Sequence, residues 1–234
     1  MVENVNLFPL FLSLKVSTIA TVLAVIIGLP ISYYLSRSNG KIADMVDALI
    51  TLPVVLPPTV LGYYLLVLFG RQSALGKFLE EKLGLLIVFT PTGAVIAAFV
   101  VSIPFFIKSA RTAFASIEPN LLNAARVLGR SEWNIFFTVI IPLSWRGIVS
   151  GITLVFARSL GDFGATLMVA GSIPNETMTM PIAIYDALLA GNQKLANLLV
   201  MIMTIVSVTL LYVIKRLEKR IIRGERSFHA SRSD

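Results

Sequence analysis

Long runs of apolar residues, separated by short polar and charged segments, dominate the chain. The apolar runs cover about residues 7–35, 48–70, 83–107, 147–171 and 195–214. Each is long enough for a helix to cross the hydrocarbon core of a bilayer, which takes about 20 residues. The pattern predicts an all-α integral membrane protein, with five transmembrane helices in a single domain over residues 1–234.

Prolines interrupt the second apolar run, where residues 51–59 read Thr-Leu-Pro-Val-Val-Leu-Pro-Pro-Thr. A proline removes a backbone donor and kinks or breaks a helix. Broken helices in membranes are tolerated where they face protein or a water-filled cavity. This stretch is therefore either the lining of a path through the membrane or a kinked packing helix. The residues concerned are Thr51, Pro53, Pro57, Pro58 and Thr59.

The fourth apolar run alone carries charges in its interior. Arg158 and Asp162 stand four residues apart, which places two side chains on the same face of a helix. Charges within a membrane are costly and normally face a protein interior or a cavity. The pair is therefore either a structural ion pair that fixes helix packing or part of a gate along a path. Gly164 nearby permits close approach of another helix.

Residues 118–142, called the polar loop below, are too polar for a bilayer yet carry helix signals. Pro119 suits a first helical position, and apolar residues then recur at helical spacing as far as Leu128. Gly129 is suited to end this helix because a terminal residue with positive φ is cheapest as glycine. Ser131 can cap the next helix. The pattern predicts two short helices joined by a tight turn, a surface feature that another protein can bind.

Composition supports the membrane interpretation. The chain is 56% hydrophobic and only 14% charged, whereas soluble domains have about 25% charged residues. A soluble core would have to bury several segments of spanning length. The chain has no cysteine, which excludes disulfides, thiolate metal sites and cysteine catalysis.

The net charge of +7 arises from basic residues beside the apolar runs, so membrane topology explains it better than nucleic-acid binding. Lys and Arg are concentrated after the first and third runs and in the tail from Lys215 onward. The positive-inside rule then places the polar loop and the C-terminus in the cytoplasm and the N-terminus outside the inner or plasma membrane. The basic tail suits contact with anionic lipid head groups.

The polar loop resembles the cytoplasmic "EAA" loop of ABC-transporter permeases. That loop reads E-A-A, three residues, G, nine residues, I, one residue, L-P. The segment that matches it contains Asn123, Ala124, Ala125, Arg126, Gly129, Val139, Ile141 and Pro142, with Asn123, Val139 and Ile141 in place of the family's Glu, Ile and Leu. The resemblance implies that the loop inserts into a groove on a separate ATPase subunit.

Three further segments look like parts of molybdate and sulfate permeases. The charged run is similar to "R-x-x-G-E-F-G-A", with Asp162 in place of Glu, and the proline stretch is similar to "D-L-P-V-V-L-P-P". Residues 171–185 resemble "N-I-P-G-E-T-x-T-x-P-x-A-I-Y" of molybdate permeases, a loop expected to meet an extracytoplasmic oxyanion-binding protein. The resemblance implies the type I ABC importer permease fold and a path for molybdate, with tungstate as a further substrate. A sulfate or thiosulfate permease is the alternative.

The resemblance also implies the assembly: a second copy of the chain, two ATPase subunits that hold ATP and Mg²⁺, and the binding protein. The chain itself has no Walker phosphate-binding motif, so we expect it to be a transport subunit rather than an enzyme, with no cofactor or metal of its own. An intramembrane enzyme would need an acid–base or metal constellation beyond Arg158 and Asp162. A membrane scaffold or receptor would not depend on an ATPase.

Overall fold

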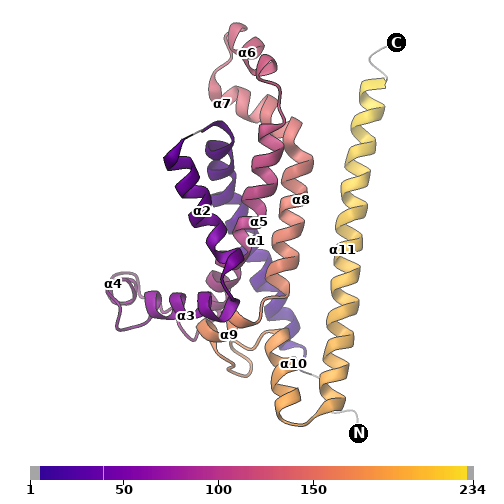
Figure 1. The fold of residues 1–234 in the computed structure, drawn as a ribbon. Coiled ribbons are helices and arrows are strands. Elements are labelled where there is room, and N and C mark those ends of the chain that lie inside the picture. The colour runs from indigo at the N-terminus through magenta and orange to yellow at the C-terminus, as the bar shows by residue number, and fades with distance from the viewer. Residues whose placement is uncertain (1–5, 39, 231–234) are drawn as a thin grey trace.

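The computed structural model describes residues 6–38 and 40–230, with side chains up to Arg216. Within these ranges every regular element is a helix (Figure 1). The elements are α1 (Phe8–Arg37), α2 (Lys41–Val55), α3 (Pro58–Phe69), α4 (Ala74–Leu83), α5 (Pro91–Ala115), α6 (Pro119–Val127), α7 (Glu132–Ile135), the π-helix η1 (Phe136–Ile140), α8 (Ile141–Leu160), α9 (Gly164–Ala170), α10 (Met180–Leu189) and α11 (Gln193–Ala230).

Three long helices, α1, α5 and α8, pack along one another and form the core (Figure 1). Small residues allow the close approach, as is usual between membrane helices. A Cβ atom on Gly28 of α1 would lie only 2.6 Å from Phe106 of α5, and one on Gly147 of α8 would collide with Ala113. Phe106 and Phe114 are fully buried along α5, so this helix is the centre of the bundle.

Several helices are long and apolar enough to cross a membrane, and the count of five spans stays a prediction. Four such helices lie in the described part of the chain, and the bent pair α2–α3 makes a fifth if it counts as one span. The two helices meet at 114°, and Pro57 and Pro58 stand at the start of α3. The second span is therefore broken at the predicted prolines, and α3 runs across the end of the bundle (Figure 1).

Two expected helices have different bounds in the structure. α5 begins at Pro91 rather than near residue 83, because residues 84–90 form a non-helical segment and the Thr90 hydroxyl oxygen caps the helix by accepting from Gly93 N at 3.3 Å. The fourth run is not one helix, since α8 ends at Leu160 and α9 begins at Gly164. The expectation that Arg158 and Asp162 share a helix is therefore wrong.

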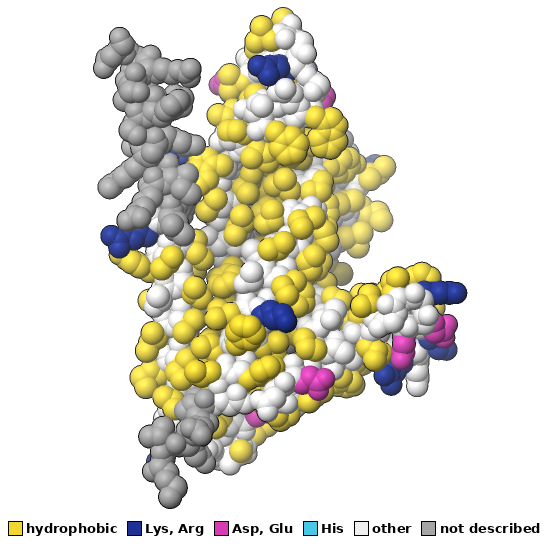
Figure 2. All heavy atoms as spheres, turned by 180° about the vertical axis from the view of Figure 1, so that it is seen from behind, with side chains coloured by type: hydrophobic (Ala, Val, Ile, Leu, Met, Phe, Trp, Pro, Cys, Tyr) yellow, Lys and Arg dark blue, Asp and Glu magenta, His cyan; other side chains and the backbone are white. Residues whose placement is uncertain are grey.

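The surface is divided as expected for a chain in lipid. Figure 2 shows apolar side chains over the flank of the bundle, with few charged side chains among them. Charged groups gather on the arm that contains α4, which projects sideways from one end of the bundle. Because charges are costly in hydrocarbon, this distribution fits a bundle whose flank faces lipid.

Candidate functional site

The polar loop forms two short helices and a tight turn at one end of the bundle (Figure 1). α6 ends in a Schellman motif, in which Arg130 N donates to Ala125 O at 3.2 Å. Gly129 has a φ of +75°, in the left-handed region that favours glycine. Ser131 caps α7, because its hydroxyl oxygen accepts from Asn134 N at 3.3 Å. The predicted turn and cap are confirmed.

An ion pair joins the two sides of this turn. Arg126 Nε lies 2.6 Å from Glu132 Oε1, and Arg126 Nη2 donates to Glu132 Oε2 at 3.3 Å. Asn123 Oδ1 accepts from Arg126 Nη1 at 3.0 Å, so the residue that replaces the motif's Glu orients the arginine. The hydrogen bond from Arg126, together with its charge, lowers the pKa of the Glu132 carboxyl. The same contact raises the pKa of the Arg126 guanidinium.

A buried apolar cluster ties the polar loop to the bundle. Leu122 of α6 and Ile135 of α7 are buried in the same cluster as Phe114 of α5. Tyr33 of α1 makes edge-to-face contacts with Phe114 and Phe136, with ring centroids 5.9 and 5.1 Å apart. These contacts pack the loop tightly against the long helices α1 and α5.

The outward face of the polar loop is apolar. Val127, Leu128, Trp133 and Phe137 are 87%, 80%, 75% and 61% exposed, and the rings of Trp133 and Phe137 stack 6.4 Å apart. Exposed apolar patches on a monomer mark interaction sites. This face was not predicted from the sequence, although the apolar residues Val127 and Leu128 at the end of an otherwise polar helix indicate it.

The residues predicted for docking divide between this surface and the core. Those that the structure exposes are Asn123, Ala124, Arg126, Gly129 and Pro142. Ala125, Val139 and Ile141 are partly buried and pack against the apolar cluster. The first group can touch a partner, and the second holds the loop in place.

The proline break and the break after α8 lie against each other. A Cβ atom on Gly164 would stand 3.2 Å from Pro58 Cβ and 3.3 Å from Thr59 N. One on Gly62 of α3 would stand 2.9 Å from Ala165 Cα. The starts of α3 and α9 are therefore in direct contact. Thr51 and Pro53 lie earlier, in the last turns of α2, and are half-buried, whereas Pro57 at the bend is exposed.

Asp162 lies between α8 and α9, and both of its oxygens have partners. Oδ1 accepts from Arg158 Nη1 at 3.2 Å. Oδ2 accepts from Thr166 N at 3.0 Å and from Thr166 Oγ1 at 2.7 Å. The Asp162 side chain is 1% exposed and that of Arg158 is 29% exposed. This geometry favours a structural pair that fixes the start of α9, and a role in a gate stays a prediction.

Among the side chains that the structure describes, which end at Arg216, no group of three or more His, Asp or Glu is arranged to hold a metal ion.

Comparison with known proteins gives one family over most of the chain. The family model described as "Binding-protein-dependent transport system inner membrane component" matches residues 20–224. The chain is 40% identical over 210 residues to the putative molybdenum transport system permease protein YvgM of Bacillus subtilis. The aligned residues cover 89% of this chain and 92% of that protein. It is 39% identical over 202 residues to the molybdenum transport system permease protein ModB of Escherichia coli (strain K12). That alignment covers 86% of this chain and 88% of the Escherichia coli protein.

Solved structures show the same fold at lower identity. An inward-facing structure of the MetNI methionine ABC transporter superposes with a TM-score of 0.71 at 20% identity, over 96% of this chain and 99% of that chain. A bacterial alginate ABC transporter in complex with its alginate-bound periplasmic protein gives a TM-score of 0.76 at 12% identity. The superposition covers 94% of this chain and 80% of the transporter chain. The expected fold class is therefore confirmed.

Proposed function

Because the chain belongs to the family of binding-protein-dependent transport system inner membrane components, we propose that it is the permease subunit of an ABC importer for molybdate. The main support for molybdate as the substrate is the 39% identity to the Escherichia coli molybdenum permease along most of both chains. Tungstate shares the tetrahedral shape, the charge and the size of molybdate, so it is a second substrate of the same path. Sulfate and thiosulfate stay as the alternative, but the relatives named above are molybdenum permeases.

The polar loop is the proposed docking element for the ATPase subunit, in keeping with its resemblance to the "EAA" loop. Its exposed face offers Trp133 and Phe137, and aromatic side chains are frequent energetic anchors of protein interfaces. The turn at Gly129 and the ion pair of Arg126 with Glu132 hold that face in one shape. The buried contacts of Leu122 would carry its movement into the bundle.

The proposed path lies where α2, α3 and α9 meet, and a second copy of the chain supplies its other half. The residues proposed to line it or to hold it are Thr51, Pro53, Pro57, Pro58, Thr59, Arg158, Asp162 and Gly164. An anion in such a path needs hydrogen-bond donors without a fixed cation strong enough to trap it. The ion pair of Arg158 with Asp162 meets that requirement, because the carboxylate neutralises the guanidinium.

For the remaining parts of the system, the proposal follows the general arrangement of ABC importers. The ATPase subunit holds ATP and Mg²⁺, so hydrolysis takes place outside this chain, which forms one transmembrane domain without a cofactor of its own. In the proposed orientation, which the distribution of Lys and Arg favours, the polar loop and the C-terminus face the cytoplasm and the N-terminus lies outside. On the outer side, the segment before α10 meets the extracytoplasmic oxyanion-binding protein.

Competition for uptake tests the substrate. Cells that carry this chain, its ATPase and its binding protein are given labelled molybdate with an excess of unlabelled tungstate or sulfate. We expect tungstate to block uptake and sulfate to leave it unchanged, because the two group 6 oxyanions share size and charge. Equal block by sulfate would assign the chain to the sulfate permeases and would leave its role as a permease intact.

A further inference from the structure

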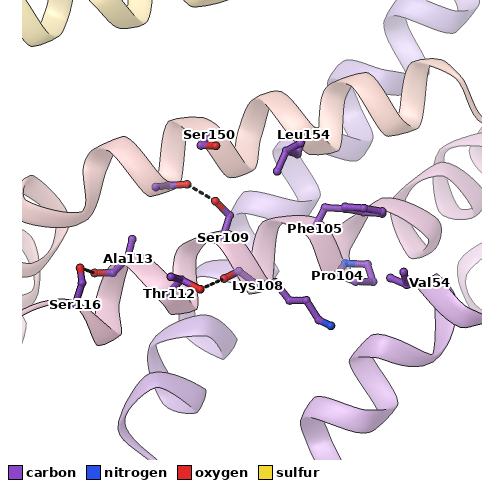
Figure 3. Close-up of a pocket in the computed structure, with 11 residues that line it drawn as sticks. Val54, Pro104, Phe105, Lys108, Ser109, Thr112, Ala113, Ser116, Ser150 and Leu154 are labelled. Carbon is purple, nitrogen blue, oxygen red and sulfur yellow. Dashed lines mark hydrogen bonds between the residues drawn. The ribbon is translucent and has the colours of Figure 1, made fainter.

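A groove opens on the side of the bundle between α2, α5 and α8, toward the end of α5 that leads into the polar loop (Figure 3). Its volume is 560 Å³. The close-up shows Lys108 extending from α5 toward α2, whereas Ser150 lies on α8, which forms another wall. Val54 of α2 also lines the groove, in the last turn of that helix and shortly before the proline break.

Hydroxyl groups line the groove beside this lysine. Ser109 Oγ donates to Gly147 O at 2.8 Å and joins α5 to α8 at the floor. Thr112 Oγ1 donates to Lys108 O at 2.9 Å, one turn further along α5. Together with Ser150 they form a polar strip within otherwise apolar walls. A hydroxyl hydrogen rotates to suit its partner, so Ser150 can donate to an anion, and Ser109 and Thr112 can do so by exchanging their backbone acceptors for it.

The charge of the groove comes from Lys108. A smaller hollow of 380 Å³ continues from it and shares Lys108 and Thr112. That hollow also contains Arg111, but Arg111 Nη1 lies 2.8 Å from Asp47 Oδ1 and is neutralised by it. None of the ion pairs between side chains that the structure describes includes Lys108. The lysine therefore gives the combined hollow a net positive charge.

We propose that this groove is a weak binding station for a tetrahedral oxyanion, on the inward half of the path. The inference rests on the proposed function and adds a site to it. Lys108 supplies the positive charge, and Ser150 with the neighbouring hydroxyl groups supplies hydrogen bonds. An exposed, well-hydrated ammonium attracts an anion without holding it tightly, which suits a step that must also release the anion. An anionic lipid head group has similar chemistry, and the experiment below separates the two.

The absence of cysteine from the chain makes a thiol probe specific. Leu154→Cys places one reporter thiol in the groove without removing a proposed hydrogen-bond donor, and Val54→Cys is a second reporter if the first variant assembles poorly. The variant is reconstituted with its ATPase and binding protein in liposomes of neutral lipid. The rates of its modification by an anionic and a cationic thiosulfonate of similar size are measured with and without molybdate.

We expect the anionic reagent to react about tenfold faster than the cationic one, at the low end of what charge steering provides. Molybdate should slow both reactions. Lys108→Gln added to the reporter should remove the preference and the protection, and Lys108→Arg should keep them. The matched control is Lys41→Gln, which removes the same charge from an exposed position at the start of α2 and should change neither.

Each remaining outcome has one meaning. If the reporter protein takes up molybdate but molybdate gives no protection, the binding station is refuted and the proposed function stands. If an anionic lipid protects the thiol and molybdate does not, the groove is a lipid site and the inference is again refuted. If the wild-type assembly takes up no molybdate at all, the proposed function itself fails, and the inference fails with it.

Discussion

A substitution series at Gly129 tests whether the shape of the turn in the polar loop governs coupling. Gly129 has a φ of +75°, and a Cβ atom there would have no heavy atom within 4 Å. A larger residue would therefore meet backbone strain rather than a steric clash. The strain falls on an exposed turn, whereas Leu122 and Ile135 keep the loop attached to the bundle. The protein should fold and insert, but with an altered docking surface.

The size of the effect follows from the left-handed conformation. For alanine it costs roughly 1–2 kcal/mol, whereas asparagine tolerates it better because its side chain can hydrogen-bond locally. Such a cost shifts the ratio of native to alternative turns by a factor of about 5–30. Valine should be worse than alanine, since a branched Cβ fits positive φ poorly. We expect coupling to fall in the order glycine, asparagine, alanine, valine.

The assay is molybdate uptake per ATP hydrolysed in proteoliposomes, with the amount of inserted protein measured alongside. Gly84→Val is the matched control, because Gly84 ends α4 at a φ of +63° with nothing within 4 Å and lies away from the polar loop. It should carry the same strain and keep normal coupling. Wild-type coupling in Gly129→Val, or an equal loss in Gly84→Val, would refute the reasoning.

Three further predictions follow from the same contacts. Trp133→Ala should weaken binding of the ATPase about tenfold in a pull-down titration, the usual scale for an aromatic anchor, with unchanged insertion; unchanged binding would place the interface elsewhere. Asp162→Ala should cost about 1–3 kcal/mol by leaving Thr166 N unpaired, seen as a lower unfolding temperature in detergent, and Asp162→Asn should cost less. Because the pKa of Glu132 is lowered, its pair with Arg126 is complete above the ordinary value of 4.5 and is lost as pH falls through the lowered one. The affinity for the ATPase should therefore change little between about pH 7 and pH 4.5 in the wild type. In Glu132→His it should change more, because the imidazole gains a positive charge beside Arg126 over that range.

The polar loop could be predicted from the sequence because helix ends carry local signals. Pro119 begins α6, Gly129 ends it and Ser131 caps α7, and each acts on its own neighbours in the chain. The proline break was predictable for the same reason, since Pro57 and Pro58 disturb the backbone wherever they stand. The angle of 114° was not, because it depends on what α3 packs against.

The break after α8 could not be read from the sequence. Arg158 and Asp162 have the spacing of a helical pair, so the local pattern favours one continuous helix. The break is stabilised instead by Asp162 binding Thr166 and by Gly164 lying against Pro58, a residue more than a hundred positions earlier. The groove around Lys108 is similarly built from three helices that are far apart in sequence.

Reconstitution tests the central claim most directly. The chain is purified, combined with its ATPase and its binding protein in liposomes, and supplied with labelled molybdate on the binding-protein side and ATP on the side of the polar loop. The account predicts that molybdate accumulates only when ATP, the ATPase and the binding protein are all present, and that Gly129→Val abolishes most of the accumulation. Accumulation without the ATPase, or none with the complete system, would contradict it.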